Sequence, residues 1–150
     1  MKALNDLEAF IAAEGPFDGV LAFSQGATLA TTYIVRQARR DPATVPFKCA
    51  IFFSGGIPCD PSLLERGEVR ELDFATDGEV IRIPTANIWG RQDEMLWGPA
   101  LNQLCAASMR TSFVHDGGHE IPGSKMKDAV TESVNAIRRA VFMAGHGWKQ

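Results

Sequence analysis

Three side chains in this sequence could together activate a hydroxyl group: Ser24, Asp93 and His119. A serine hydroxyl becomes an effective nucleophile only when a base takes its proton. A histidine serves as that base when a carboxylate holds its ring in one tautomer. The sequence therefore contains the residue types for acyl transfer, provided that the fold brings them together.

The serine lies in the segment AFSQG, between an apolar run and a segment with a helical pattern. A nucleophilic serine at such a junction sits on a strained strand-to-helix turn, which requires small residues two positions before and after it. Ala22 and Gly26 meet this requirement. The backbone N–H of Gln25, at the start of the helix, would then stabilise an oxyanion. Alone the motif is weak, because a serine before a helix often only caps it.

The proposed acid and base each follow a predicted strand, and the chain order is Ser24, Asp93, His119. This is the order of nucleophile, acid and histidine in α/β-hydrolases. Asp93 could instead cap the helix that follows it, and His119 could be an ordinary loop residue. The joint pattern favours a catalytic triad over coincidence.

Other acids and bases fit the pattern less well. His115 lies within a predicted strand, and His146 lies in the C-terminal tail. Asp116 shares the short loop of the proposed base and would need a contorted turn to orient it. Glu94 is adjacent to the proposed acid and would point elsewhere.

The elements that would position these residues alternate between strand and helix. Apolar runs bounded by Gly or Pro predict strands, and apolar spacing of three and four predicts helices. The predicted helices cover residues 3–14, 25–40, 96–109 and 124–143, and the strands cover 18–23, 48–54, 85–90 and 111–115. Residues 57–84 are predicted to be irregular, and strand 18–23 to be buried on both faces.

This alternation predicts an α/β fold with a mainly parallel sheet between helical layers. In such sheets functional groups gather at the carboxyl ends of the strands. Ser24 follows a strand end directly, Asp93 follows the strand end at Gly90 by three residues, and His119 follows the strand end at His115 by four. The three side chains are therefore expected at one edge of the sheet.

Composition limits the class of protein. The 150 residues suit one globular domain, with 45% hydrophobic and 22% charged residues. The net charge of -3 gives no reason to expect nucleic acid or a membrane as partner. No signal sequence or membrane span is predicted, so the expected location is cytoplasmic. The cysteines show no metal-ligand spacing and are expected to be small, mostly buried thiols: Cys49, Cys59 and Cys105.

Four linked segments give a more specific signal: EGPFDGVLAFSQGATLA, FKCAIFFSGGIP, IPTANIWGRQDE and HDGGHEIPG. Together they resemble the fungal serine hydrolases of the FSH type, a branch of the α/β-hydrolases. The resemblance implies a three-layer α/β/α fold, with Ser24 as nucleophile, Asp93 as acid and His119 as base. It also implies hydrolysis of a carboxylic ester or thioester through an acyl-serine, with a link to fungal polyketide and other secondary metabolism.

The sequence departs from the family pattern in two ways. Ala22 stands where the family usually has glycine. Members of the family also begin with a strand, an HG-containing loop, a helix and another strand, which this chain lacks. Residues 1–150 are therefore expected to form the carboxyl-terminal part of the fold, as one N-terminally incomplete domain. That loop normally supplies the second oxyanion donor, and losing one donor costs roughly 10²–10³ in kcat.

The missing neighbour would also leave the strand before Ser24 at the edge of the sheet. A free apolar edge invites pairing with another chain. A homodimer or larger assembly through this edge is therefore expected.

The expected ligand is a small acyl ester or thioester, and no metal or organic cofactor is expected. Candidate pocket walls are apolar residues beside the catalytic positions, together with parts of residues 57–84: Phe23, Met95, Leu96 and Trp97. Plain core packing is the competing interpretation for these four. Two other functions stay open, a non-catalytic domain that associates through its sheet edge and a small-molecule binding protein in which Ser24 only caps a helix.

Overall fold

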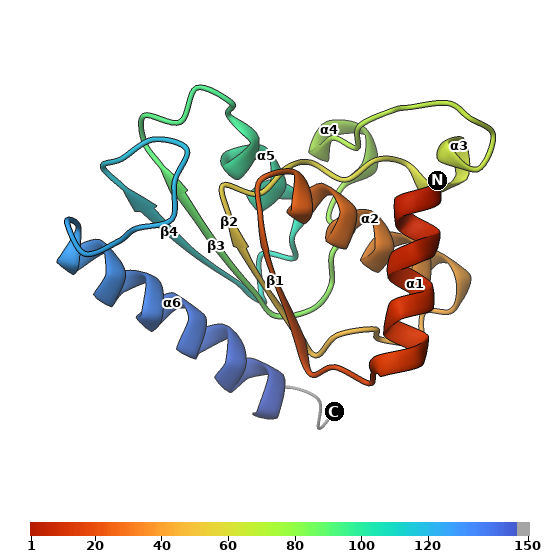
Figure 1. Cartoon of the computed structure of the whole chain (residues 1–150), viewed down its shortest axis with the longest axis horizontal. Coiled ribbons are helices and arrows are strands. Elements are labelled where there is room, and N and C mark those ends of the chain that lie inside the picture. The colour runs from red at the N-terminus through yellow and green to blue at the C-terminus, as the bar shows by residue number, and fades with distance from the viewer. Residues whose placement is uncertain (147–150) are drawn as a thin grey trace.

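A parallel four-stranded sheet organises residues 1–146, the part of the chain that the computed structural model describes (Figure 1). The strands lie side by side in the order of the sequence: β1 (Gly19–Phe23), β2 (Cys49–Phe53), β3 (Thr85–Gly90) and β4 (Arg110–His115). The longer helices are α1 (Lys2–Glu14), α2 (Gln25–Arg40), α5 (Trp97–Leu104) and α6 (Lys127–His146). The predicted parallel α/β arrangement is confirmed.

Helices cover the two faces of the sheet unequally. On one face α2 and α5 pack against the strands, and α1 packs on the outer side of α2. The other face is covered by α6, which packs against β2, β3 and β4 (Figure 1). Small side chains of α6, Ala136 and Ala140, are buried against the sheet. Strand β2 is therefore buried along its whole length.

Strand β1 differs from its prediction of burial on both faces. Ala22 is buried beneath α2, whereas Leu21 is 61% exposed and Phe23 is 38% exposed. Within residues 1–146, β1 pairs only with β2, so its other edge is free. The apolar run predicts the strand correctly, but burial depends on α6, which does not reach this far across the sheet.

The segment 57–84, predicted to be irregular, contains two short helices, α3 (Pro61–Leu64) and α4 (Phe74–Asp77). Each begins after an aspartate whose side chain accepts hydrogen bonds from the first turn. Asp60 accepts from two backbone N–H groups of α3, and Asp73 accepts from one of α4. These N-caps stabilise helices too short to show an apolar period.

Two helix boundaries also differ from prediction. Helix α5 ends at Leu104, although the apolar pattern extends the prediction to residue 109. Cys105 is extended, and the Arg110 guanidinium donates to the carbonyls of Asn102 and Cys105 at the end of the helix. The last helix runs from 127 to 146, and residues 147–150 of the predicted polar tail lie outside the described residues. None of the helices within residues 1–146 combines the length and the apolar character that a membrane span needs.

Candidate active site

Ser24 lies at the turn from β1 into α2, in a strained conformation. Its φ is 55° and its ψ is -124°, which is uncommon for a residue other than glycine. Its N–H donates to Phe53 O at 3.1 Å, and its carbonyl accepts from the N–H groups of Ala27 and Gly56 at 3.0 and 2.9 Å. Although Ser24 occupies the N-cap position, its side chain makes no capping hydrogen bond. Its hydroxyl therefore remains available to another partner.

That partner is His119. Its Nε2 lies 2.8 Å from Ser24 Oγ, and its Nδ1 lies 2.8 Å from Asp93 Oδ2. The other carboxylate oxygen, Oδ1, accepts from the Met95 N–H at 3.0 Å. The three predicted residues thus form one continuous hydrogen-bonded series at the carboxyl edge of the sheet. Asp93 does not cap the helix that follows, because the N-cap of α5 (Trp97–Leu104) is Leu96 and the Met95 N–H lies in the turn before the helix.

Burial and hydrogen bonding act in opposite directions on Asp93. Its side chain is only 3% exposed, and burial raises the pKa of its carboxyl group. The hydrogen bonds from His119 and from the Met95 N–H outweigh that effect. The pKa of Asp93 therefore lies below its ordinary value, and the group is a carboxylate at neutral pH.

Two loops are joined to bring the acid and the base together. After β3, the Arg91 N–H donates to His115 O at 2.7 Å, and the Gln92 N–H donates to Gly117 O at 3.0 Å. Gly90 makes this approach possible, because an added Cβ would overlap the carbonyl of Gly117. The sequence prediction missed this role, although a glycine within a strand, here its last residue, is a signal of close backbone approach.

The glycine two residues after Ser24 is not needed for the reason that the sequence suggested, namely a tight strand-to-helix turn. A Cβ added at Gly26 would meet nothing within 4 Å, so crowding does not require glycine there. The crowded position is Gly56, where a Cβ would overlap the Thr28 hydroxyl and approach Ser24 O. In the sequence Gly55 and Gly56 mark only the end of the predicted strand 48–54, because the contact of Gly56 with the serine turn joins segments far apart in the chain.

The alternative acids and bases take other roles. His115 is buried, and its Nδ1 accepts from the Gly117 N–H at 3.1 Å. Asp116 is exposed and pairs with Arg91 at 3.3 Å. His146 ends α6 and lies outside the serine–histidine–aspartate series. Within residues 1–146, no group of three or more His, Cys, Asp or Glu side chains is placed to hold a metal ion.

A hollow of about 490 Å³ lies beside the three residues. Of the four predicted walls, Met95 and Trp97 line it, and the Trp97 ring meets the His119 ring edge-on with centroids 6.2 Å apart. The Phe23 ring lies 5.1 Å from the same histidine. Leu96 does not line the hollow and is 69% exposed, because its left-handed backbone (φ 56°) turns it toward solvent.

Fold and site together define an α/β-hydrolase-type domain, with serine, histidine and aspartate at the carboxyl edge of a parallel sheet. The family model described as Serine hydrolase (FSH1) matches residues 1–131, and the chain belongs to this family. The resemblance seen in the sequence is thereby confirmed.

Several curated proteins are similar to this chain. Esterase FPY3 of Fusarium mangiferae is 42% identical, over 96% of this chain and 66% of that protein. Hydrolase phiM of Fungal sp. (strain ATCC 74256) is 35% identical, over 80% and 57% respectively. Family of serine hydrolases 3 of Saccharomyces cerevisiae is 32% identical, over 83% and 46%. The chain thus spans about half to two thirds of the length of these relatives.

A solved structure supports the fold alone. The esterase domain of a Rhodothermus marinus protein superposes with a TM-score of 0.53 at 16% identity. The match covers 91% of this chain and 67% of that domain.

Proposed function

We propose that this chain is a serine hydrolase that cleaves a carboxylic ester or thioester through an acyl-serine intermediate. The observation that carries the proposal is the series Ser24, His119, Asp93, with both contacts at 2.8 Å. Membership of the serine hydrolase family supports the same reaction class.

In the proposed reaction His119 Nε2 takes the proton of the Ser24 hydroxyl as the oxygen attacks the substrate carbonyl carbon. Asp93 accepts a hydrogen bond from Nδ1–H, which leaves the Nε2 lone pair directed at the serine. The same carboxylate stabilises the imidazolium that forms. The proposed reaction thus gives each of the three residues a separate task.

The tetrahedral oxyanion would be stabilised at the N-terminus of α2. The first N–H groups of a helix have no intrahelical acceptor, and the N–H of Gln25 is the one that follows the nucleophile. The imidazolium then gives its proton to the leaving alcohol or thiol as the bond from carbon breaks. A water molecule attacks the acyl-serine with the histidine as base, which regenerates the serine.

Three finer expectations stay predictions. One domain over the whole chain and a cytoplasmic location follow from length and composition, and a place in fungal secondary metabolism is implied by the resemblance. The relatives' names supply the words esterase and hydrolase for those proteins. They support an ester as the substrate class that we propose here.

Active-site labelling tests the proposal. The wild-type chain should react with a fluorophosphonate and hydrolyse p-nitrophenyl acetate, and Ser24→Ala should do neither. Ser108→Ala is the matched control, because this serine is exposed and lies in a loop away from the described series. Labelling of the wild type no stronger than that of Ser24→Ala would remove the enzyme hypothesis for this chain.

A second candidate function is association through the free edge of β1, with or without catalysis. Leu21 supports it, because this strand residue is 61% exposed beside an unpaired edge of the described sheet. Light scattering at micromolar concentration should give a dimer or larger assembly for the wild type and a smaller species for Leu21→Lys. Val69→Lys, also at a highly exposed apolar residue, is the control. A wild-type monomer would contradict this candidate.

A further inference from the structure

We propose that a second hollow, adjacent to the catalytic one, binds the acyl chain of the substrate. It lies between the first turn of α1, the first two turns of α2 and the segment 59–71, and has a volume of about 370 Å³. That volume is within the range of small-molecule sites. The proposal rests on the proposed function and adds which part of the substrate is bound and where.

The two hollows share two walls. Gln25 and Trp97 line both the catalytic hollow and this second one. Gln25 directly follows Ser24, and its N–H is the proposed oxyanion donor. An acyl chain attached to the serine oxygen would therefore enter the second hollow beside Gln25 and Trp97.

The position of the histidine distinguishes the acyl chain from the leaving group. The leaving oxygen or sulfur must come within hydrogen-bond reach of His119 Nε2 to receive its proton. His119 lines the catalytic hollow, together with Glu94 and Met95, and does not line the second one. The leaving group is thus held on the His119 side, and the second hollow remains for the acyl chain.

The lining defines the chemistry of the chain that fits. Leucines from three elements provide apolar contacts, namely Leu4 of α1, Leu29 of α2 and Leu64 of α3. The hydroxyl of Thr32 is already hydrogen-bonded within the protein, because it donates to Thr28 O at 2.6 Å and accepts from the Cys59 N–H at 3.0 Å. It therefore adds little polar character to the hollow.

One residue in the lining of this hollow is acidic. This residue, Glu71, forms an isolated antiparallel bridge with Cys59. A carboxylate on the substrate would be repelled there, since like charges at short range disfavour each other. An uncharged aliphatic acyl chain is therefore the ligand class that suits this hollow.

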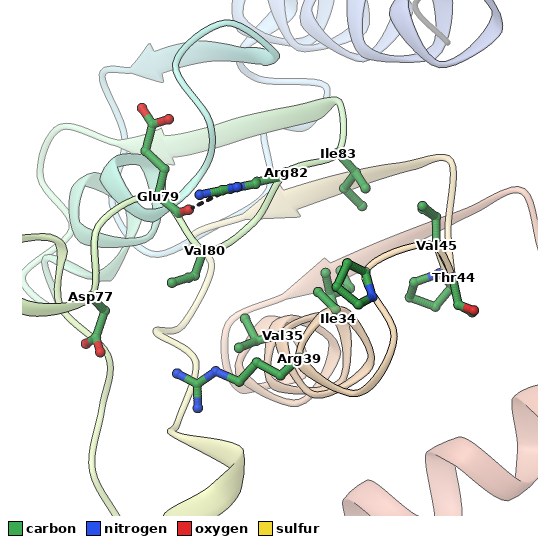
Figure 2. Close-up of a pocket in the computed structure, with 13 residues that line it drawn as sticks. Ile34, Val35, Arg39, Thr44, Val45, Asp77, Glu79, Val80, Arg82 and Ile83 are labelled. Carbon is green, nitrogen blue, oxygen red and sulfur yellow. Dashed lines mark hydrogen bonds between the residues drawn. The ribbon is translucent and has the colours of Figure 1, made fainter.

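A third hollow provides a matched control. Its volume is about 430 Å³, and it is lined by the last turns of α2, by residues 42–46 and by residues 77–83 (Figure 2). Ile34 lies roughly three turns along α2 from Ser24. This hollow shares no lining residue with the catalytic one. Filling it tests whether added bulk alone alters activity.

The experiment compares hydrolysis of p-nitrophenyl acetate and p-nitrophenyl octanoate. Leu64→Trp and, separately, Cys59→Trp fill the proposed acyl hollow, and Val45→Trp fills the control hollow. Each filling variant should lower kcat/KM for octanoate about tenfold or more, with acetate changed less than about twofold. Val45→Trp should leave the octanoate-to-acetate ratio at the wild-type value. Circular dichroism identifies any variant that fails to fold, and the second filling variant then carries the test.

Failure of this inference and of the proposed function give different results. If both filling variants leave the octanoate-to-acetate ratio unchanged in an active enzyme, the acyl hollow is overturned and the serine hydrolase stands. A ratio that changes equally in Val45→Trp also overturns the acyl hollow. If the wild type hydrolyses neither ester and is not labelled by fluorophosphonate, both proposals are overturned.

Discussion

Two buried aspartates, Asp93 and Asp60, have nearly the same local setting and very different surroundings. Each accepts hydrogen bonds from backbone N–H groups that follow it in the chain. Each has a pKa below its ordinary value. Asp93, however, bonds to His119, whereas Asp60 pairs with two arginines, Arg39 at 3.2 Å and Arg70 at 2.9 Å.

The partner decides what each carboxylate can do. A guanidinium stays protonated at any pH that a protein tolerates, so the Asp60 cluster is a fixed set of charges. It connects α2 to the start of α3, and Arg70 extends it to Asp77 at 2.9 Å. An imidazole can gain and lose a proton, and the series from Asp93 ends at a hydroxyl facing a hollow. A lowered pKa marks both places, and only the partner identifies the candidate active site.

The largest expected difference between the two aspartates is in catalysis. Asp93→Asn should lower kcat about 10⁴-fold, because the amide no longer selects the tautomer or stabilises the imidazolium. Asp60→Asn should leave kcat per folded molecule within about twofold of the wild-type value, since no step of the proposed reaction uses it. Initial rates with p-nitrophenyl acetate measure both. Equal losses of kcat in the two variants would contradict the separate roles of the two aspartates.

The second largest effect is expected in stability, as a difference between alanine substitutions of two glycines near the serine turn, Gly56 and Gly26. Gly56→Ala should destabilise the fold by about 1–3 kcal/mol, because its Cβ would overlap the Thr28 hydroxyl and crowd Ser24 O. Gly26→Ala should be neutral or stabilising by up to about 1 kcal/mol, because the space beside it is open and alanine favours the helix. Urea unfolding of the two variants measures the difference. A larger loss for Gly26→Ala would contradict this account of the turn.

Asp60 should matter for stability in a defined pH range. Burial raises the pKa of Asp60, but the Leu63 N–H and the two arginines outweigh that effect and hold it at about 2, below the ordinary 3.8. The carboxylate therefore contributes about 2 kcal/mol of stability above pH 4, which is lost as the pH falls toward 2. Urea unfolding should show Asp60→Asn less stable than the wild type at pH 7. A gap between the two proteins that does not narrow by pH 2.5 would refute this assignment.

The smallest effect is expected at Asp116, the alternative acid in the histidine loop. Its pair with Arg91 at 3.3 Å is exposed on both sides, and such pairs contribute about 0–1 kcal/mol. Asp116→Asn should change kcat by less than about twofold and leave the urea midpoint within error. If this variant lost activity as Asp93→Asn does, the assignment of the acid would have to be reversed.

The sequence predicted the order of strands and helices well, because these follow from local apolar spacing and from Gly and Pro at the boundaries. Helix 25–40 is found at the predicted residues, and each of the four strands lies within one residue of its prediction at either end. The short capped helices α3 and α4 were missed, since four residues are too few to show a period. The end of α5 was missed because Arg110, which contacts its last carbonyls, comes from the next strand.

For the candidate site, too, the sequence predicted the residues and did not predict the contacts between them. The sequence by itself determined which residues could form the series, because Ser24, Asp93 and His119 follow strand ends of one parallel sheet. Only the tertiary structure decided that the series closes, through the backbone hydrogen bonds that join the loops after β3 and β4. It also decided that Gly56 rather than Gly26 confines the serine, and that Leu96 faces solvent while Trp97 separates two hollows. These contacts join segments far apart in the chain, so no local pattern of residues could encode them.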